Sequence, residues 1–564
     1  MKKLAVITGF GGINAAGRSA GHHAFRRMIF DSLSEQDQQT TLAALGALMG
    51  TDDRDAILEG SLVREWDNVD WDAKAVPFHE AFKDEDGTQC WRLTHRRLPV
   101  QSAGQMPKGF DPAKLYRSRH HPRGLQMAVY AASDALGSLG IEWETLCQHV
   151  GPDEIAVYAG SAMGQQDGNG HGGMMQSALM GKRTSSKQCA MGLSEMPADF
   201  INAYVLGNVG KTGSMTAACA TFLYNLQLAK DDIESGRRRI VIVGNAEAPL
   251  VPEIVEGYNA MTALASEANL KKLDNKGDNE EADFRRAVRP FGENCGFTIA
   301  ESAQFFVLTD DQLALELGLN VLGSIGDVQV NADGYKKSIS NPGIGNYLTM
   351  AKVMAATRRE LGEASLKNSF VHAHGSSTPQ NRVTESHIYE ALAGAFGIEN
   401  WPITAVKTFV GHSLAAASAD QLTAALGTWA TGVIPGIKTT EKVADDVHQQ
   451  GLEFVLQDKQ VDSEQLDVAF INAKGFGGNN ASAAVVSPTK TLELISQKHG
   501  TDAIAAWSQA NTAIQSQASA YDSRMVAGEI EPRYLFGENV LGPEDLEITD
   551  TEIRIKGWDK PVVL

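Results

Sequence analysis

The chain is poor in cysteine, and the arrangement of its cysteines excludes two kinds of scaffold. Its 564 residues include five cysteines, an odd number, without a CxxC pair. A disulfide framework needs paired cysteines and a structural zinc site needs clustered ones, so the sequence favours neither. Free thiols are typical of a reducing compartment, and we expect a cytoplasmic protein. The five are Cys90, Cys147, Cys189, Cys219 and Cys295.

The sequence also lacks a long apolar run and an excess of basic residues. No stretch approaches the roughly 18 to 20 apolar residues of a membrane-spanning helix. The apolar start at Leu4–Ile7 ends too soon for a signal peptide. Fifty Lys and Arg against 69 Asp and Glu give a formal net charge of −19. A chain with this charge repels nucleic acid and anionic lipid, so we expect neither nucleic-acid binding nor membrane insertion.

The residues that are present predict an α/β protein. Apolar residues make up 43% of the chain and charged residues 21%, a globular composition. The length exceeds one ordinary core, so we expect two or more units or a duplicated fold. Short apolar runs of the buried-strand type alternate with helical patterns. The runs are Leu4–Ile7, Ile155–Tyr158, Arg239–Val243 and Val468–Ile471, and the helical patterns are Gly124–Ser138, Tyr347–Leu361 and Thr384–Phe396.

Three segments depart from this alternation. Residues 52–107 are polar and irregular, which indicates an insertion, and the charged segment 267–286 indicates a surface excursion. Residues 488–564 change character, with a polar helix followed by a tail rich in Pro and Gly. Because this last segment is too short and polar for a core of its own, we expect it to pack on the rest of the molecule.

A glycine-rich segment, Thr8–Ile13, follows the first strand and has some likeness to a dinucleotide-binding turn. A lone match of this kind is weak evidence. A short-chain dehydrogenase also needs a Tyr with a Lys four residues later, and no tyrosine of this chain has one. We therefore expect a tight turn at the strand end and no bound nucleotide.

The strongest candidate for a nucleophile is Cys219. Small residues precede it, an amphipathic helical pattern follows, and the strand at Ile240 comes next. This pattern places the cysteine on a strand-to-helix turn, where the partial positive charge of a helix N-terminus favours thiolate. Free cysteines are commonly buried structural residues, and the local sequence alone weighs the two interpretations about evenly.

Three further motifs also follow strands, where α/β folds place their chemistry. Two contain histidines, His374 and His412, and the third is a glycine-rich turn at Gly475–Asn480. One histidine alone is more often structural, but a thiol, two imidazoles and a glycine-rich turn together form a consistent acyl-transfer set. His372 is expected to pack under the strand end. The pairs His22-His23 and His120-His121 are read as turn or surface residues.

Together these segments resemble the β-ketoacyl-acyl carrier protein synthase family, of the Cys-His-His kind. The resemblance runs from the first strand to about Val486, apart from the insertions. Its motifs are the stretch around Cys219, His374-Gly375-Ser376-Ser377-Thr378-Pro379 for HGTxTP, Lys407 with Gly411-His412 for KxxxGH, Gly475-Phe476-Gly477-Gly478-Asn479-Asn480 for GFGGTN, and Arg289-Pro290-Phe291 with Gly296-Phe297 for RPF…GF. Three positions depart from these motifs: Ser376 and Asn479 each stand where Thr is usual, and Cys295 replaces an acidic residue.

The resemblance implies a duplicated thiolase fold with five layers, αβαβα, and a homodimer. The halves would be residues 1–315 and 316–487, followed by the extension 488–564. The insertion and the extension are similar to those of the FabY-type branch of the family.

The resemblance also implies roles for individual residues. Cys219 would accept the acyl group, and His374 and His412 would promote decarboxylation of malonyl-acyl carrier protein. An ion pair of Lys407 with Glu385 would support the histidines. The backbone N–H groups of Cys219 and Phe476 would form an oxyanion hole, with Phe476 also gating the acyl pocket. Ser376 and Thr378 would bind the pantetheine arm. No metal or cofactor is implied.

Several alternatives stay open at this point. A non-catalytic partner subunit, such as a chain-length factor, lacks the nucleophile that Cys219 supplies. A polyketide-type ketosynthase is the other alternative. A thiolase needs a second motif-bound cysteine, and a Cys-His-Asn synthase has Asn in the place of His412. An acidic carrier protein would need a basic patch near the pocket mouth. Candidate clusters are Lys114, Arg117, Arg119 and Arg123, and separately Lys271 and Lys272. Whether the acyl donor is an acyl-coenzyme A or an acyl carrier protein, and its chain length, cannot be read from the sequence.

Overall fold

Two half-sheets with the same strand order form the centre of the molecule. The computed structural model describes residues 2–338 and 341–564. In each half the first strand pairs antiparallel with the fifth, the fifth pairs antiparallel with the fourth, and the fourth, second and third follow in parallel. In chain order the strands are β1 (Ala5–Asn14), β7 (Ile155–Gly160), β8 (Lys211–Gly213), β9 (Ile240–Glu247) and β10 (Ser302–Asp310), then β11 (Ser324–Ala332), β12 (Ser369–His372), β13 (Trp401–Thr404), β17 (Val468–Gly475) and β18 (Asn479–Val486).

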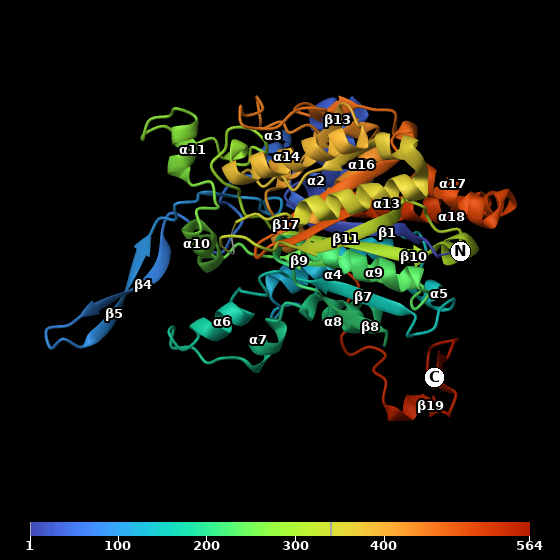
Figure 1. Cartoon of the computed structure of the whole chain (residues 1–564). Helices are drawn as coiled ribbons and strands as arrows, with labels where there is room; N and C mark the ends of the chain where they lie inside the picture. Colours follow the sequence, from blue (N-terminus) through green and yellow to red (C-terminus); the bar gives the residue numbers. More distant parts are fainter. Residues whose placement is uncertain (1, 339–340) are drawn as a thin grey trace.

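The two half-sheets meet edge to edge through a short contact. Ala5 and Val6 of β1 pair with Ile325 and Ser324 of β11. The repeated order and polarity of the strands identify a duplicated unit, which confirms the expectation of a duplicated α/β fold (Figure 1).

Helices cover both faces of each half-sheet. Alternate residues of a strand enter different cores: Val6 joins one apolar cluster while Ala5 and Ile7 join another. The second cluster lies between the half-sheets and contains α9 (Thr221–Glu234) and α16 (Ala417–Thr431). The outer layers are α4 (Arg123–Gly137) with α8 (Met196–Ile201), and α13 (Gly345–Lys367) with α14 (Pro379–Phe396). These are the five layers αβαβα that the resemblance implies.

The predicted turn at the glycine-rich segment Thr8–Ile13 is wrong. β1 runs unbroken from Ala5 to Asn14 and pairs with β10 along this length. The glycines permit close helix packing instead: a Cβ atom on Gly11 would lie 2.2 Å from the backbone nitrogen of Ala135 in α4. A side chain cannot fit there, so glycine is required by the approach of the helix and not by a turn.

The predicted insertion and excursion both lie on the outside of the molecule. A hairpin of β4 (Val76–Lys83) and β5 (Gln89–Arg96) extends from the body, and α11 (Glu267–Leu273) projects above it (Figure 1). The hairpin is exposed on both faces, with Trp91 62% and Leu93 59% exposed.

Most of the C-terminal extension packs on the N-terminal half. Its helices are α17 (Pro488–His499) and α18 (Thr501–Val526), and Ile495 and Met525 enter the outer apolar core. The carboxylate of Asp522 accepts hydrogen bonds from Arg18 at 2.6 Å and from His23 at 3.0 Å. The reading of His23 as a turn or surface residue is therefore wrong, because this contact buries it. The same reading fails for His121, which is buried against Tyr534 of the extension.

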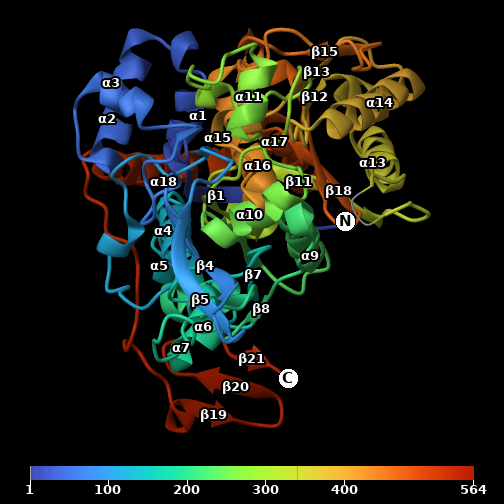
Figure 2. The same cartoon turned by 90° about the vertical axis from the view of Figure 1, so that its left-hand side faces the viewer.

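The end of the extension differs from its helices. Three short strands, β19 (Leu546–Ile548), β20 (Glu552–Ile555) and β21 (Val562–Val563), form a separate small sheet that stands off the body (Figure 2). This end still contacts the body, because Trp558 packs against the outer apolar core and the Lys560 ammonium donates to the His149 carbonyl at 2.6 Å. Among the residues described, no helix combines the length and the apolar character needed to cross a membrane.

Candidate active site

The Cys219 side chain lies in a tight turn between β8 and α9. Residues Ala218–Ala220 form one helical turn, and α9 begins at Thr221. The Thr221 hydroxyl fixes this turn, because it accepts a hydrogen bond from the Ala217 N–H at 2.9 Å and donates one to the Ala218 carbonyl at 2.6 Å. The predicted strand-to-helix position of the cysteine is therefore correct.

Burial makes Cys219 a protonated thiol at rest. The side chain is only 3% exposed, and burial raises its pKa to about 11 despite the nearby Lys407 ammonium. The backbone N–H groups of Phe476 and of Cys219 itself act in the opposite direction and lower the pKa. Burial therefore opposes the thiolate that the helix N-terminus favours.

The two histidines face each other and present the same nitrogen to the cavity. The ring of His374 lies 5.4 Å from that of His412, at nearly a right angle. The Nδ1 of His374 accepts the Lys474 N–H at 3.4 Å, and the Nδ1 of His412 accepts the Leu414 N–H at 3.3 Å. Because each Nδ1 is an acceptor, the ring proton resides on each Nε2, and both imidazoles can donate a hydrogen bond there.

Both imidazoles are neutral. Burial lowers the pKa of each well below its usual value, and the Lys407 ammonium lowers both further. A neutral imidazole with its proton on Nε2 is a hydrogen-bond donor whose strength increases when negative charge develops opposite it.

The predicted ion pair between Lys407 and Glu385 is absent. The Lys407 ammonium donates instead to the carbonyl of His374. The Glu385 carboxylate accepts the backbone N–H groups of His374 at 2.7 Å and Gly375 at 2.9 Å, and three side-chain donors besides. The carboxylate is saturated by these donors, so the two charged groups hold opposite sides of the His374 backbone without touching.

The backbone N–H groups of Phe476 and of Cys219 itself both act on the Cys219 thiol and lower its pKa. Phe476 lies in the turn between β17 and β18, and its side chain is 36% exposed, against the ring of Tyr258. Gly475 allows this turn to approach the nucleophile, because a Cβ atom there would lie 2.4 Å from the Ala217 carbonyl. These two N–H groups are the candidates for the oxyanion hole that the resemblance implies.

A cavity of about 540 Å³ brings most of the predicted site residues together. Cys219, His374 and His412 line it, and Ser376 and Thr378 lie on its wall with their hydroxyl oxygens 3.5 Å apart. Thr378 also caps α14, with Asn381 N–H donating to its hydroxyl at 3.3 Å. Phe476 and Cys295 also line this cavity, whereas Lys407 and Glu385 stay behind its wall.

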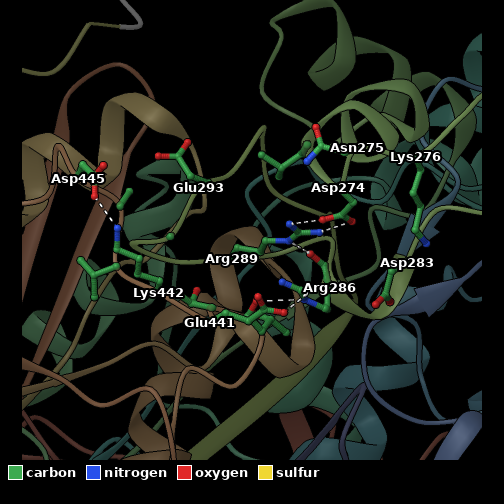
Figure 3. Close-up of a pocket in the computed structure, with 16 residues that line it drawn as sticks. Asp274, Asn275, Lys276, Asp283, Arg286, Arg289, Glu293, Glu441, Lys442 and Asp445 are labelled. Carbon is green, nitrogen blue, oxygen red and sulfur yellow. Dashed lines mark hydrogen bonds and ion pairs between the residues drawn. The ribbon is translucent and has the colours of Figure 1, made fainter.

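A second cavity, of about 560 Å³, lies between the excursion and residues 439–445 and contains none of the predicted site residues. Several of its charged side chains are paired across it, among them Arg289 with Asp274 and Arg286 with Glu441 (Figure 3). At its edge, the Arg289 N–H donates to the Ser377 hydroxyl at 2.7 Å. It therefore buttresses the loop after His374.

Three residues of the site were missed by the sequence reasoning. Lys474 lines the active-site cavity, directly before the glycine-rich turn. The Asn472 amide donates to the Glu385 carboxylate at 3.0 Å. The carboxyl of Glu247 accepts the Ala415 N–H at 3.3 Å, and burial raises the pKa of Glu247 to about 7. Only Lys474 left a signal in the sequence, as a charged residue at the end of an apolar strand. His372 is fully buried under the strand end, as expected.

The basic clusters proposed for carrier docking lie outside the active-site cavity. The charge of Arg123 is already neutralised, because its guanidinium forms an ion pair with the buried carboxylate of Glu301. Lys271 is half-buried and paired with Glu267 at 3.0 Å. The exposed members are Lys114, Arg117, Arg119 and Lys272.

A buried thiol, two neutral imidazole donors and convergent N–H groups in one cavity define an acyl-transferring condensation site. The model of the β-ketoacyl synthase N-terminal domain matches residues 83–314, and that of the C-terminal domain matches residues 322–441. The chain therefore belongs to the β-ketoacyl synthase family.

Its similarity to one curated relative spans the whole chain. It is 48% identical to the beta-ketoacyl-acyl-carrier-protein synthase FabY of Pseudomonas aeruginosa, over 100% of this chain and 98% of the relative. The crystal structure of the noncanonical ketosynthase FabY from P. aeruginosa superposes with a TM-score of 0.96 at the same coverage. The insertion and the extension are thus shared with a FabY-type enzyme.

More distant structures share the fold. A beta-ketoacyl synthase from Burkholderia phymatum has a TM-score of 0.62 at 22% identity, and it covers 86% of this chain. The chain also matches the 3-oxoacyl-acyl-carrier-protein synthase 2 of Staphylococcus aureus at 25% identity. The match covers 69% of this chain and 91% of the relative.

Proposed function

We propose that this chain is a β-ketoacyl-acyl carrier protein synthase of fatty acid biosynthesis, and that it condenses an acyl thioester with malonyl-acyl carrier protein. The observation that carries the proposal is the geometry of His374 and His412, whose Nε2–H groups face the cavity that contains the Cys219 thiol. Two neutral donors beside a buried thiol suit a reaction in which negative charge develops on a thioester oxygen.

The first step is transfer of the acyl group to Cys219. The sulfur attacks the carbonyl carbon of the acyl thioester, a new carbon–sulfur bond forms, and the donor's carbon–sulfur bond breaks. The proton of the Cys219 thiol, whose pKa is raised to about 11, passes to the departing thiol. The N–H groups of Cys219 and Phe476 would stabilise the tetrahedral oxyanion.

The second step consumes the malonyl group. The carbon–carbon bond to its carboxylate breaks and releases carbon dioxide, and the electron pair passes into an enolate whose oxygen faces the Nε2–H groups of His374 and His412. The enolate carbon attacks the acyl carbonyl on Cys219, and the sulfur leaves and takes up one proton. Neutral donors suit this step, because they stabilise the enolate without protonating it.

The remaining residues take supporting roles in this proposal. Lys407 and Glu385 hold the His374 backbone, and Ser376 and Thr378 bind the amide groups of the pantetheine arm. Phe476 would gate the acyl pocket. The name of the Pseudomonas relative supports an acyl carrier protein as the partner.

Further assignments belong to the same proposal. The protein would act in the cytoplasm as a homodimer, with either an acyl-coenzyme A or an acyl carrier protein as the acyl donor. The repeated strand order supports a division into residues 1–315 and 316–487, with 488–564 as the extension. Polyketide synthesis is the second candidate: three curated relatives named as polyketide synthases are 23% to 25% identical.

The test is a condensation assay with malonyl-acyl carrier protein and an acyl donor. The wild type is expected to form a β-ketoacyl thioester and carbon dioxide in equal amounts, whereas Cys219→Ala should form no β-ketoacyl product. A wild-type protein that binds the carrier but forms no product would indicate a non-catalytic partner subunit.

A further inference from the structure

Lys474 places a positive charge in the active-site cavity. It is the penultimate residue of β17, directly before the turn that carries Phe476, and its half-buried side chain lines the cavity with Cys219 and His374. Its backbone N–H donates to the His374 ring at 3.4 Å. The Lys474 backbone is therefore directly hydrogen-bonded to one of the two active-site histidines.

Among the residues that the structure describes, no carboxylate forms an ion pair with the Lys474 ammonium. Its hydrogen bonds go to two neutral oxygens of α14, at 3.0 Å from Asn381 Oδ1 and 3.0 Å from Thr384 Oγ1. Glu385 and Asp333 act on it only at longer range, since neither forms an ion pair with it. A half-buried cation that is hydrogen-bonded but not neutralised is electrostatically unsatisfied, and burial lowers its pKa accordingly.

The substrates differ in the charge that they would bring to this position. The acyl group transferred to Cys219 carries none, while the malonyl group carries a carboxylate two bonds from the thioester carbon that His374 and His412 bind in the proposed reaction. An ammonium with one remaining N–H can donate a charge-assisted hydrogen bond to a carboxylate. In a chain with a net charge of −19, a local cation is also needed to draw an anion into the cavity.

We propose that Lys474 binds the carboxylate of the malonyl thioester and thereby selects the malonyl substrate for the second step. This inference rests on the proposed function and adds a specificity residue to it. After Cys219 is acylated, the cation favours entry of the malonyl thioester over a second uncharged acyl thioester. Lys474 acts on binding and orientation of the malonyl group, and it exchanges no proton with the reacting atoms.

The test separates the two half-reactions in Lys474→Gln, in which a neutral amide replaces the ammonium. Acylation of Cys219 by the acyl donor is measured by intact-protein mass spectrometry, and the KM for malonyl-acyl carrier protein is measured by product formation. We expect the KM to rise about tenfold, with the acylation rate within about twofold of wild type. Lys474→Arg, which keeps the charge, should recover most of the loss.

Lys442→Gln is the matched control, because it removes one positive charge from an exposed side chain outside the active-site cavity. Its KM should stay at the wild-type value. An unchanged KM in Lys474→Gln would overturn the proposal. An equal weakening of both half-reactions would also overturn it. The ammonium would then bind the phosphate of the pantetheine arm or stabilise the fold of the loop. Failure of the wild type to condense would refute the proposed function itself and is visible before any variant is compared.

Discussion

The protonation of the three central side chains follows from burial more than from local charge. Cys219 is held as a thiol, and His374 and His412 are held neutral, because the cavity removes water from all three. Lys407 reinforces the neutrality of the histidines, and its own pKa is lowered by burial to about 8. In the proposed reaction, these neutral donors stabilise the negative charge that develops during decarboxylation.

The donor role of His374 predicts a selective loss of the second step. In His374→Gln the Nε2–H donor is displaced, so condensation should fall about 100- to 1,000-fold while acylation of Cys219 proceeds. The two are measured separately, as β-ketoacyl product and as acyl-enzyme mass. His387→Gln, an exposed histidine on α14, serves as the control. If acylation fell as far as condensation, His374 would act in the first step as well.

Sequence reasoning selected Cys219, His374 and His412, which line one cavity, because each follows a strand at a recognisable turn. It could not place Lys407 and Glu385 correctly, because their partners are backbone groups that no spacing reveals. Lys474 was also missed, because its environment is set by α14, about 90 residues earlier in the chain.

At the scale of elements, short apolar strands and amphipathic helices were predictable, and the errors concern contacts between distant segments. The glycines of β1 are typical of a turn, but in the structure they allow α4 to pack closely against the strand. His23 has no signal for burial in its own neighbourhood, because Asp522 of α18 buries it from the far end of the chain. Long-range packing of this kind overrides local patterns.

The contact of α18 with the N-terminal half predicts a pH-dependent stability. The Arg18 and His23 partners lower the pKa of Asp522 from its usual 3.8 to about 2. Because the folded pKa is depressed, the stabilisation is present above about pH 4 and is lost as the pH falls through 2. Asp522→Asn should therefore lower the free energy of unfolding by about 2 kcal/mol at pH 7, and by less below pH 4.

Denaturant unfolding of the wild type and Asp522→Asn at several pH values measures this difference. Asp502→Asn, on the same helix, is the control. An equal stability of Asp522→Asn and wild type at pH 7 would show that the extension does not depend on this contact.

At the scale of the whole molecule, the duplicated architecture could be expected from length and alternation together with the family motifs. The exposed hairpin of β4 and β5 and the small sheet of β19, β20 and β21 could not, because segments that project from the body carry no core pattern. The net charge of −19 repels an acidic carrier protein, so docking of such a carrier requires a local basic patch.

The exposed basic cluster of Lys114, Arg117 and Arg119 predicts a charge-dependent KM. Reversing Arg117 and Arg119 to Glu should raise the KM for malonyl-acyl carrier protein about tenfold and leave the rate of Cys219 acylation by an acyl-coenzyme A unchanged. Steady-state kinetics at low and high salt measure the effect, which should shrink as salt increases. Lys272→Glu tests the other cluster, and no change in either variant would place docking elsewhere.

The central claim is that Cys219 carries the acyl group, and intact-protein mass spectrometry tests it most directly. The wild type and Cys219→Ala are incubated with acetyl-coenzyme A and, separately, with a long-chain acyl carrier protein. The account predicts one acyl adduct on the wild type and none on Cys219→Ala, and the donor that reacts separates initiation from elongation. An adduct that persists in Cys219→Ala, or no adduct from any donor, would contradict it.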